Sequence, residues 1–379
     1  MAGGLPVSNV AMCAINTFLV ATANAHSVKA SSGCNGRTGL RRELSRTLAC
    51  RMLQVPYCHI TFTLPHQLNG LARRYPTVIY NLLLRSCWKT IAQLCGEEDN
   101  VGGKPGMTAV LHTWGSDLKY HVHVHCLVTF GGLSGGPKPE WKWPWRKHKL
   151  APFRKLRGAF RAIFLCGLKR LMDKEEVAYH RSFTEMEAEL LQKSWVVNHQ
   201  RPTAETKVIE EYLGRYICRI GISNKRLHYD AGGKNVRIEY NDYSSQEQGK
   251  AAPKKYRELP PLVAMHLFLQ HQLPPYFQRV RHYGLHSGVT YAKLKDKIPD
   301  KLKRNGHTVR TVIQILQTLL AEEPNRCENC GGCSFEAELI EPSRHYLNRH
   351  VLHQGRSPPR GQAGPVEFGS STGQAPLSR

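Results

Sequence analysis

The stretch KYHVHVHCLVTF, residues 119–130, decides the fold of this chain. Histidines alternate with apolar residues through it, and a period of two residues predicts a β-strand. The alternation puts His121, His123 and His125 on one face of that strand. The other face is apolar and is expected to belong to the core: Tyr120, Val122, Val124 and Cys126. Gly131 and Gly132 follow, so we expect a turn after the strand.

Three imidazoles on one face of a buried strand need partners. A neutral imidazole is costly to bury unless its nitrogens are used. A divalent metal ion or a phosphate is the usual partner of such a cluster. We therefore interpret the histidine strand as a ligand site, with satisfied core histidines as the alternative.

The charge of the chain indicates the kind of partner. The 379 residues are enough for two or three domains, and 53 Lys and Arg against 29 Asp and Glu give a net charge of +24. An excess of this size favours a polyanion such as a nucleic acid. No basic amphipathic segment stands out, so we expect no membrane partner.

Cysteine usage and apolar segments predict the compartment. Twelve cysteines are too dilute for a disulfide scaffold and favour a reducing cytosol. Residues 10–25 are apolar and end like a signal-peptide cleavage site, but no Lys or Arg precedes them. No other stretch is long and apolar enough to span a bilayer. We expect a cytoplasmic protein.

Other strands and helices can be placed around the histidine strand. Strands are predicted at residues 55–64, 107–114 and 236–240, and residues 277–285 read as a basic strand or loop. Helices are predicted at residues 77–94, 150–172, 203–219, 262–273 and 309–322. The strands on either side of Gly115-Ser116-Asp117 should pair antiparallel. With residues 57–64 they make a three-stranded core with one helix across it.

Residues 141–149, WKWPWRKHK, alternate aromatic and basic side chains. Bases stack on exposed aromatic rings, and Lys and Arg contact phosphates, so this composition suits single-stranded nucleic acid. An ordinary solvated loop with a few packed tryptophans explains it equally well.

Tyr212 and Tyr216 are four residues apart in the predicted helix 203–219, so they share one face. A tyrosine hydroxyl is a weak nucleophile because its ordinary pKa is about 10. Beside a divalent cation it can attack a phosphodiester, and two tyrosines allow two successive transfers. A tyrosine pair at this spacing is often a core feature, so its meaning depends on the histidine strand and the charge.

The histidine strand, Gly131-Gly132 and the downstream sequence Tyr212-Leu-Gly-Arg-Tyr216 resemble the two-tyrosine HUH transposases of the insertion sequence 91 type. These are related to rolling-circle replication initiators and relaxases. Residues 56–66, 222–227 and 279–285 also match, in the family's order. The resemblance covers about residues 53–290.

The resemblance implies an α+β fold, in which an antiparallel sheet with flanking helices forms a ferredoxin-like HUH core. It implies that His123 and His125 bind Mg²⁺ or Mn²⁺, with His121 as a third ligand or an outer group. It implies Tyr212 and Tyr216 as nucleophiles that cut single-stranded DNA at transposon ends and the target, leaving a 5′-phosphotyrosine and a 3′-hydroxyl. The expected DNA-binding residues are Arg219, Arg226, Arg279 and Arg281.

The resemblance also implies a bacterial, nucleoid-associated protein that works with the host replication machinery. The chain departs from the family at its beginning, where a zinc-binding domain with Cys-x-x-Cys pairs is usual. The cysteines in residues 1–50 are Cys13, Cys34 and Cys50, and they form no Cys-x-x-Cys pair. We therefore expect a poorly ordered remnant of the N-terminal segment there. We assign residues 51–290 to the catalytic domain, 291–354 to a helical segment and 355–379 to a disordered tail.

A small cysteine and histidine cluster falls in the segment 291–354. Its members have spacings close to those of zinc sites: Cys327, Cys330, Cys333, His345 and His350. Two interpretations of this cluster remain: a zinc site, or surface thiols without a ligand.

Three other functions remain open. Residues 121–127 also fit the histidine pattern of the histidine-triad nucleotide hydrolases, which need neither a basic chain nor a tyrosine pair. A plasmid replication initiator or relaxase would use the same chemistry as a transposase. A catalytically inactive DNA-binding remnant would bind single strands in a salt-dependent way without cutting them.

Overall fold

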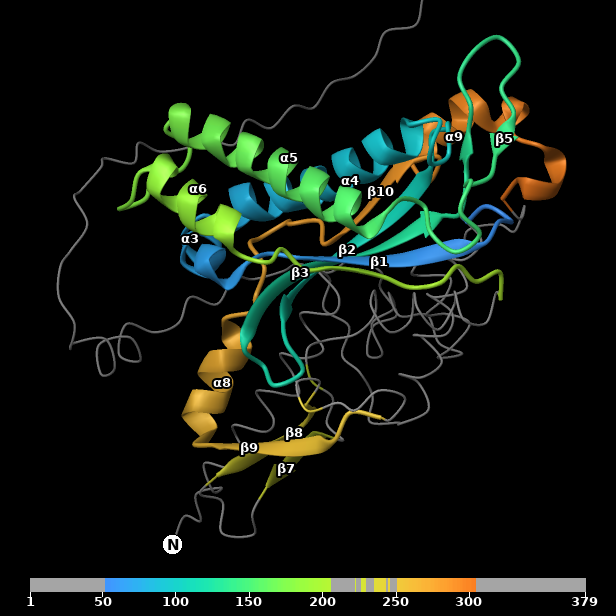
Figure 1. Cartoon of the computed structure of the whole chain (residues 1–379). Coiled ribbons are helices and arrows are strands. Elements are labelled where there is room, and N and C mark those ends of the chain that lie inside the picture. Colours follow the sequence, from blue (N-terminus) through green and yellow to red (C-terminus); the bar gives the residue numbers. More distant parts are fainter. Residues whose placement is uncertain are drawn as a thin grey trace, which may run out of the picture. The chain divides into compact units, whose positions relative to one another are not determined.

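A five-stranded antiparallel sheet lies at the centre of the residues that the computed structural model describes, which are 52–205, 222, 226–229, 235–242, 245 and 251–304 (Figure 1). The strand order is β10-β2-β3-β1-β6. The strands are β1 (Tyr57–Thr63), β2 (Gly106–Trp114), β3 (Tyr120–Thr129), β6 (Val197–His199) and β10 (Val280–Gly284). The predicted α+β class and the antiparallel pairing around residues 115–117 are confirmed.

The order of elements is that of a ferredoxin-like fold. Helices α3 (Asn69–Arg74) and α4 (Pro76–Gly96) connect β1 to β2, and α5 (Phe153–Asp173) and α6 (Phe183–Gln192) connect β3 to β6. Without β10, the sheet has the β-α-β-β-α-β order with the two hairpin strands on one side of β1 and the last strand on the other. Strand β10 then pairs with the outer edge of β2.

Helices α4 and α5 cover one face of the sheet (Figure 1). The apolar residues of β3 face them, as the alternation predicted, and Val122, Val124 and Cys126 are fully buried in this cluster. Phe62 of β1 packs on Phe160 of α5 with ring centroids 4.8 Å apart. The opposite face of β3 therefore carries the histidines.

A chain of hydrogen bonds fixes β10 and the turn after it to the sheet. The Tyr57 hydroxyl donates to the Leu53 carbonyl (3.1 Å), so it accepts from Nε2 of His286 (3.2 Å). Nδ1 of His286 must then accept from the Thr108 hydroxyl (2.9 Å), which accepts in turn from Nδ1 of His282 (2.9 Å). Each buried group in this chain is satisfied, and the tautomers of both histidines follow from it.

Residues 291–304 pack onto the same domain. Leu53 forms a bridge with Arg304, and Ile298 is buried in a cluster with Tyr57 and Leu127. Helix α9 (Gly288–Leu294) follows β10 directly, and its Tyr291 lies beneath the Arg304 guanidinium at 3.9 Å.

A second, three-stranded sheet lies next to the tip of the β2–β3 hairpin. It contains β7 (Leu227–Tyr229), β8 (Val236–Asn241) and β9 (Lys254–Leu259), followed by helix α8 (Pro261–Leu269). Its core includes Leu118 from the hairpin, which has a φ of 60° and is 2% exposed. The hairpin tip is thus part of the core of the small sheet.

Most predicted elements are confirmed within the described residues. The predicted strands correspond to β1, β2, β3, β8 and β10, and the predicted helices to α4, α5 and α8. The helix predicted from residue 203 is wrong at its start, because Thr203 is extended and pairs with Tyr57. Residues 206–219, the helix 309–322, residues 1–50 and the tail 355–379 lie outside the described residues. Among the described helices, none combines the length and apolarity needed to cross a bilayer.

Gly284 ends β10 with a φ of +55°, and a Cβ there would meet the Pro105 carbonyl and the Trp88 ring. We expect Gly284→Ala to lower the free energy of unfolding by more than about 1 kcal/mol. A Cβ added at Gly158, inside α5, would have no atom within 4 Å apart from the backbone of its own helix. Gly158→Ala should therefore raise the free energy of unfolding by about 0.5–1 kcal/mol. Urea unfolding of both variants checks this, and equal effects would contradict it.

Candidate metal centre

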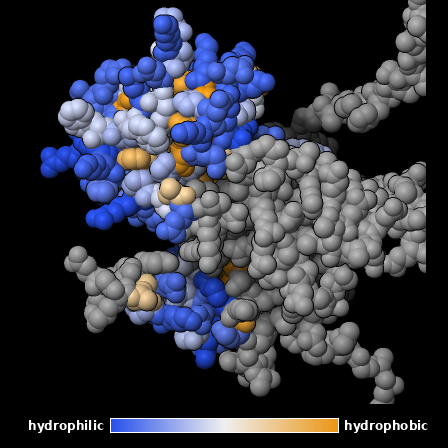
Figure 2. Space-filling model, turned by 90° about the vertical axis from the view of Figure 1, so that its right-hand side faces the viewer, coloured by the Kyte–Doolittle hydropathy of each residue, from blue (hydrophilic) through white to orange (hydrophobic). Residues whose placement is uncertain are grey.

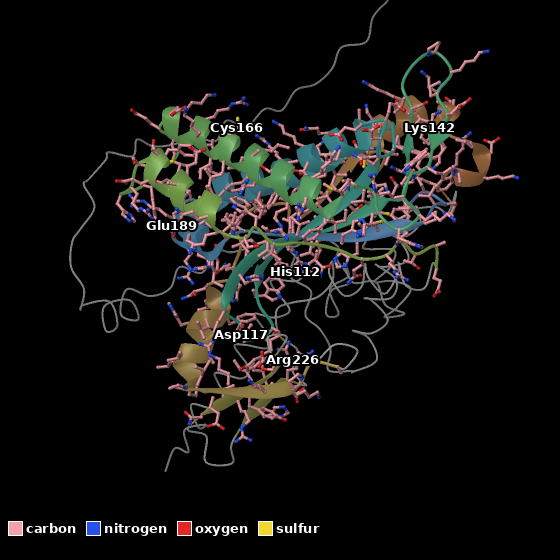
Figure 3. All side chains as sticks on the ribbon, viewed as in Figure 1. His112, Asp117, Lys142, Cys166, Glu189 and Arg226 are labelled. Carbon is pink, nitrogen blue, oxygen red and sulfur yellow. The ribbon has the colours of Figure 1, made fainter. Side chains whose placement is uncertain are left out.

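Three histidines converge on the sheet face opposite the helices. One ring nitrogen from each of His112, His123 and His125 lies within 4.8 Å of the other two. His112 comes from β2 and is directly opposite His123 of β3 in the register of the hairpin. Figure 3 shows His112 on the sheet, above the hairpin tip that holds Asp117.

The ring of His123 is held in one orientation. Its Nδ1 donates to the His121 carbonyl at 2.9 Å, so the hydrogen of a neutral ring is on Nδ1 and its Nε2 has a lone pair. That Nε2 faces Nε2 of His125 at 3.1 Å. Two nitrogens bound at about 2.1 Å to one ion are separated by roughly 3.0–3.4 Å, so this spacing fits a shared metal ion.

A second group of polar side chains holds His125. Its Nδ1 lies 3.0 Å from Nε2 of His59 and 3.3 Å from the Thr61 hydroxyl. The same hydroxyl lies 3.1 Å from Nε2 of His59. Metal-binding histidines commonly use their second nitrogen in this way, because it fixes the ring and its tautomer.

Burial keeps these rings neutral. It lowers the pKa of His123 to about 4 and the pKa of His125 well below its usual value, and the neighbouring histidines lower both further. Burial likewise lowers the pKa of His59 to about 4. A histidine must be neutral to bind a metal, so His123 and His125 are in the required state at neutral pH.

His121 has a different position from the one its spacing suggests. Its side chain is exposed, with its ring centroid 5.1 Å from that of His123, and it is not in the convergent group. Its backbone carbonyl orients His123. Its role as a third ligand or an outer group stays a prediction.

Sequence reasoning missed His112 as a member of the group. Its strand and its antiparallel pairing with β3 were predicted, but the residue pairs across the hairpin were not worked out. The His112 ring stacks on Trp114, with centroids 4.7 Å apart, and meets the His125 ring edge-on at the same distance. Counting pairs outward from the turn would have brought His112 close to His123.

Tyr212, Tyr216 and Arg219 lie outside the described residues, but the chain on both sides of them is placed. Before them, Thr203 exchanges two backbone hydrogen bonds with Tyr57 of β1, at 2.7 and 2.9 Å. After them, Ile222 is buried in a cluster with Leu118. Both ends of the segment are therefore fixed to strands or loops that carry or adjoin the histidine cluster.

Arg226 is bonded within the chain. Its Nε donates to the Glu239 carbonyl at 2.6 Å and its guanidinium also donates to the Ser116 carbonyl (Figure 3). Arg257 donates to the Asp117 carbonyl at 3.0 Å. These bonds connect the small sheet to the hairpin tip, and a DNA contact by Arg226 stays a prediction.

The other predicted DNA-binding arginines are near β10. Arg281 bonds to Asn81 of α4 and to the Gln278 carbonyl, and its guanidinium lies 5.2 Å from the centre of the Phe277 ring. Arg279 precedes the strand, and its carbonyl accepts from the Leu111 amide. The predicted zinc residues 327–350 lie outside the described residues.

Residues 106–293, which include β2, β3 and β10, match a family model described as "Putative transposase". This part of the chain is therefore similar to that transposase family. The chain is 31% identical over 242 residues to "Putative transposase y4qJ" of Sinorhizobium fredii (strain NBRC 101917 / NGR234), covering 62% of this chain and 59% of that protein. It is 27% identical over 293 residues to "Transposase for insertion sequence element IS801" of Pseudomonas savastanoi pv. phaseolicola, covering 74% and 67%.

No solved structure matches this chain. The chain spans 59% of the length of the first of these relatives and 67% of the second. The match with the family model includes all three convergent histidines. The histidine cluster therefore belongs to the part of the chain that is shared with transposases.

We expect His112→Ala to weaken Mn²⁺ binding at least as much as the roughly 10- to 100-fold loss typical of an outer partner. The reason is that it removes one of the three convergent nitrogens. His121→Ala should cost less than about tenfold, and His266→Ala in α8 is the control. Isothermal titration with Mn²⁺ measures this, and a larger loss for His121→Ala would overturn the assignment of His112.

Arg226→Ala should lower the free energy of unfolding by about 1.5–3 kcal/mol, because two carbonyls lose a charged donor. Arg237→Ala is the matched control, since it removes an exposed ion pair with Glu258 and should cost less than about 1 kcal/mol. Urea unfolding compares the two. A loss of DNA affinity in Arg226→Ala without a loss of stability would favour a DNA contact instead.

Proposed function

We propose that this chain is a transposase that cuts and rejoins single-stranded DNA through phosphotyrosine intermediates, as in rolling-circle transposition. The observation that carries the proposal is the convergence of three imidazole nitrogens on the sheet face opposite the helices, within residues that match a transposase family. The net charge of +24 supports a nucleic-acid substrate.

The donor set bears on the choice of metal. Three imidazoles suit Mn²⁺ better than Mg²⁺, because Mn²⁺ accepts nitrogen ligands more readily, although both ions prefer oxygen ligands. We propose Mn²⁺ as the better of the two expected ions. When bound, such an ion supplies Lewis-acid polarisation of a phosphodiester oxygen.

The tyrosines have the covalent role in this proposal. The hydroxyl oxygen of Tyr212 or Tyr216 attacks the phosphorus, a bond from that oxygen to phosphorus forms, and the bond from phosphorus to the 3′-oxygen breaks. The hydroxyl proton goes to the leaving 3′-oxygen, so a 5′-phosphotyrosine and a free 3′-hydroxyl result. The second tyrosine makes the matching cut at the target or at the other end, and no nucleotide cofactor is consumed.

The attachment of the tyrosine segment supports this arrangement. Residues 206–221 run between Thr203, paired with β1, and Ile222, packed on Leu118 at the hairpin tip. Strand β1 carries His59 and Thr61, and the hairpin carries His112, His123 and His125. The described residues on both sides of Tyr212 and Tyr216 therefore contact the elements that carry the histidines.

The observations support the alternative functions less than they support a transposase. Both relatives described above are named as transposases, which favours this function over a replication initiator or relaxase with the same chemistry. In a histidine-triad hydrolase one histidine would attack the phosphate. Here His123 and His125 are buried with their Nε2 atoms turned toward each other, which suits ligands better than a nucleophile.

The test is incubation of the full chain with labelled single-stranded DNA from the ends of its element, in Mn²⁺ or in EDTA, followed by a denaturing gel. We expect a protein–DNA adduct in Mn²⁺ alone, and its loss when Tyr212 and Tyr216 are both changed to Phe. Each single Phe variant should keep one of the two cuts.

Tyr276→Phe is the control for the tyrosine variants, because Tyr276 is an exposed residue outside the segment. An adduct that survives the double substitution would assign the nucleophile to another residue. Binding without an adduct in either condition would favour the inactive DNA-binding remnant.

A further inference from the structure

The hairpin of β4 (Gly132–Leu133) and β5 (Trp141–Lys142) carries tryptophans that are increasingly exposed along the chain. Trp141 is buried against the sheet, Trp143 is 51% exposed and Trp145 is 84% exposed. The rings of Trp141 and Trp143 meet edge-on with centroids 5.9 Å apart. We call residues 132–149 the tryptophan hairpin.

The backbone beneath the exposed rings is fixed. The Trp145 amide donates to the Asn100 carbonyl at 3.0 Å, and Arg146 donates to the Asp99 carbonyl and to Oδ1 of Asn100. Trp145 is therefore held at a defined position while most of its indole faces solvent. Its exposed indole contributes little to the core, so a binding role explains this position better than packing does.

The charge around these rings is positive. Residues 141–149 hold three Lys and Arg besides Lys142 and no acidic residue. Among the nearby acids, Glu140 makes a long and exposed ion pair with Lys142 at 3.7 Å, and the exposed Asp99 bonds to Arg146 through its backbone carbonyl. Such a pair contributes little to stability, so the lysines keep their attraction for phosphates. Hydrophilic residues cover most of the described surface in Figure 2, in keeping with a polar ligand.

We propose that the tryptophan hairpin is a stacking subsite for the single-stranded DNA that flanks the cut. Trp145 and Trp143 take bases on their rings, and Lys142, Lys147 and Lys149 lie beside the phosphates. Every base has a π-face, so such a site holds a strand without reading its sequence. The proposal deepens the proposed function and rests on it only for the relation of the subsite to the cut.

The position of the hairpin relative to the histidines sets the length of DNA between them. Trp141 packs in a cluster with Leu127, two residues beyond His125 on the same face of β3. From His125 to Gly131 the strand covers about 20 Å at roughly 3.3 Å per residue. At the stacked spacing of about 3.4 Å, about six nucleotides would cover this distance from His125 to the start of the hairpin.

The test measures binding of the full chain to labelled oligothymidylate of about 20 nucleotides by fluorescence anisotropy, in EDTA so that no cutting occurs. We expect Trp145→Ala to weaken binding about 5- to 100-fold, while Trp145→Phe stays within about threefold. Tyr276→Ala removes another exposed aromatic and should have no effect.

Salt dependence separates stacking from charge. Trp145→Ala should leave the slope of log affinity against log salt unchanged, while Lys147→Gln with Lys149→Gln should make it shallower by about 0.7 for each lost contact. Unchanged affinity of Trp145→Ala would overturn the subsite and leave the exposed ring to a protein partner.

The two proposals fail separately. If the unchanged chain forms no adduct while Trp145→Ala still weakens binding, the phosphotyrosine chemistry is rejected and the subsite is kept. If the adduct forms normally and Trp145→Ala does not change binding, the subsite is rejected and the phosphotyrosine chemistry is kept.

Discussion

The pairing of β2 with β3 is the constraint on which the rest of the site depends. Its register places His112 opposite His123, so a ligand group forms from two strands that are neighbours in sequence. The period of two residues then directs the histidines to one face and the apolar residues to the helices. A register shift of one residue would turn the histidines toward α4 and α5, and the burial of their partners would be lost.

The two ends of this hairpin have different surroundings. Near the turn, the small sheet is bonded to the backbone of residues 116–118 through Arg226, Arg257 and His271. At the other end, β3 leads into the tryptophan hairpin, whose first ring packs beside Leu127. Along the hairpin, the histidines lie between these two regions.

The sequence predicted this fold well because its strongest signals are local. Alternation in residues 119–130 predicted β3 and the identity of both its faces, and the spacing of apolar residues predicted α4 and α5. His112 was missed because the convergence arises from pairing between strands, which the period of one strand does not contain. The helix prediction at Thr203 was wrong because the hydrogen bonds of this residue go to Tyr57. That partner lies 146 positions earlier in the chain, so local sequence patterns do not show it.

Leu118 has a consequence for the order in which the chain assembles. The small core has five buried side chains in the described residues, and one of them is Leu118 from the hairpin. A core of this size is only marginally stable by itself. Packing around Leu118, which belongs to the hairpin of the larger sheet, adds to its stability. The hairpin therefore acts as a template on which the small sheet folds. Ile222 belongs to the same small core, so its burial also depends on that step.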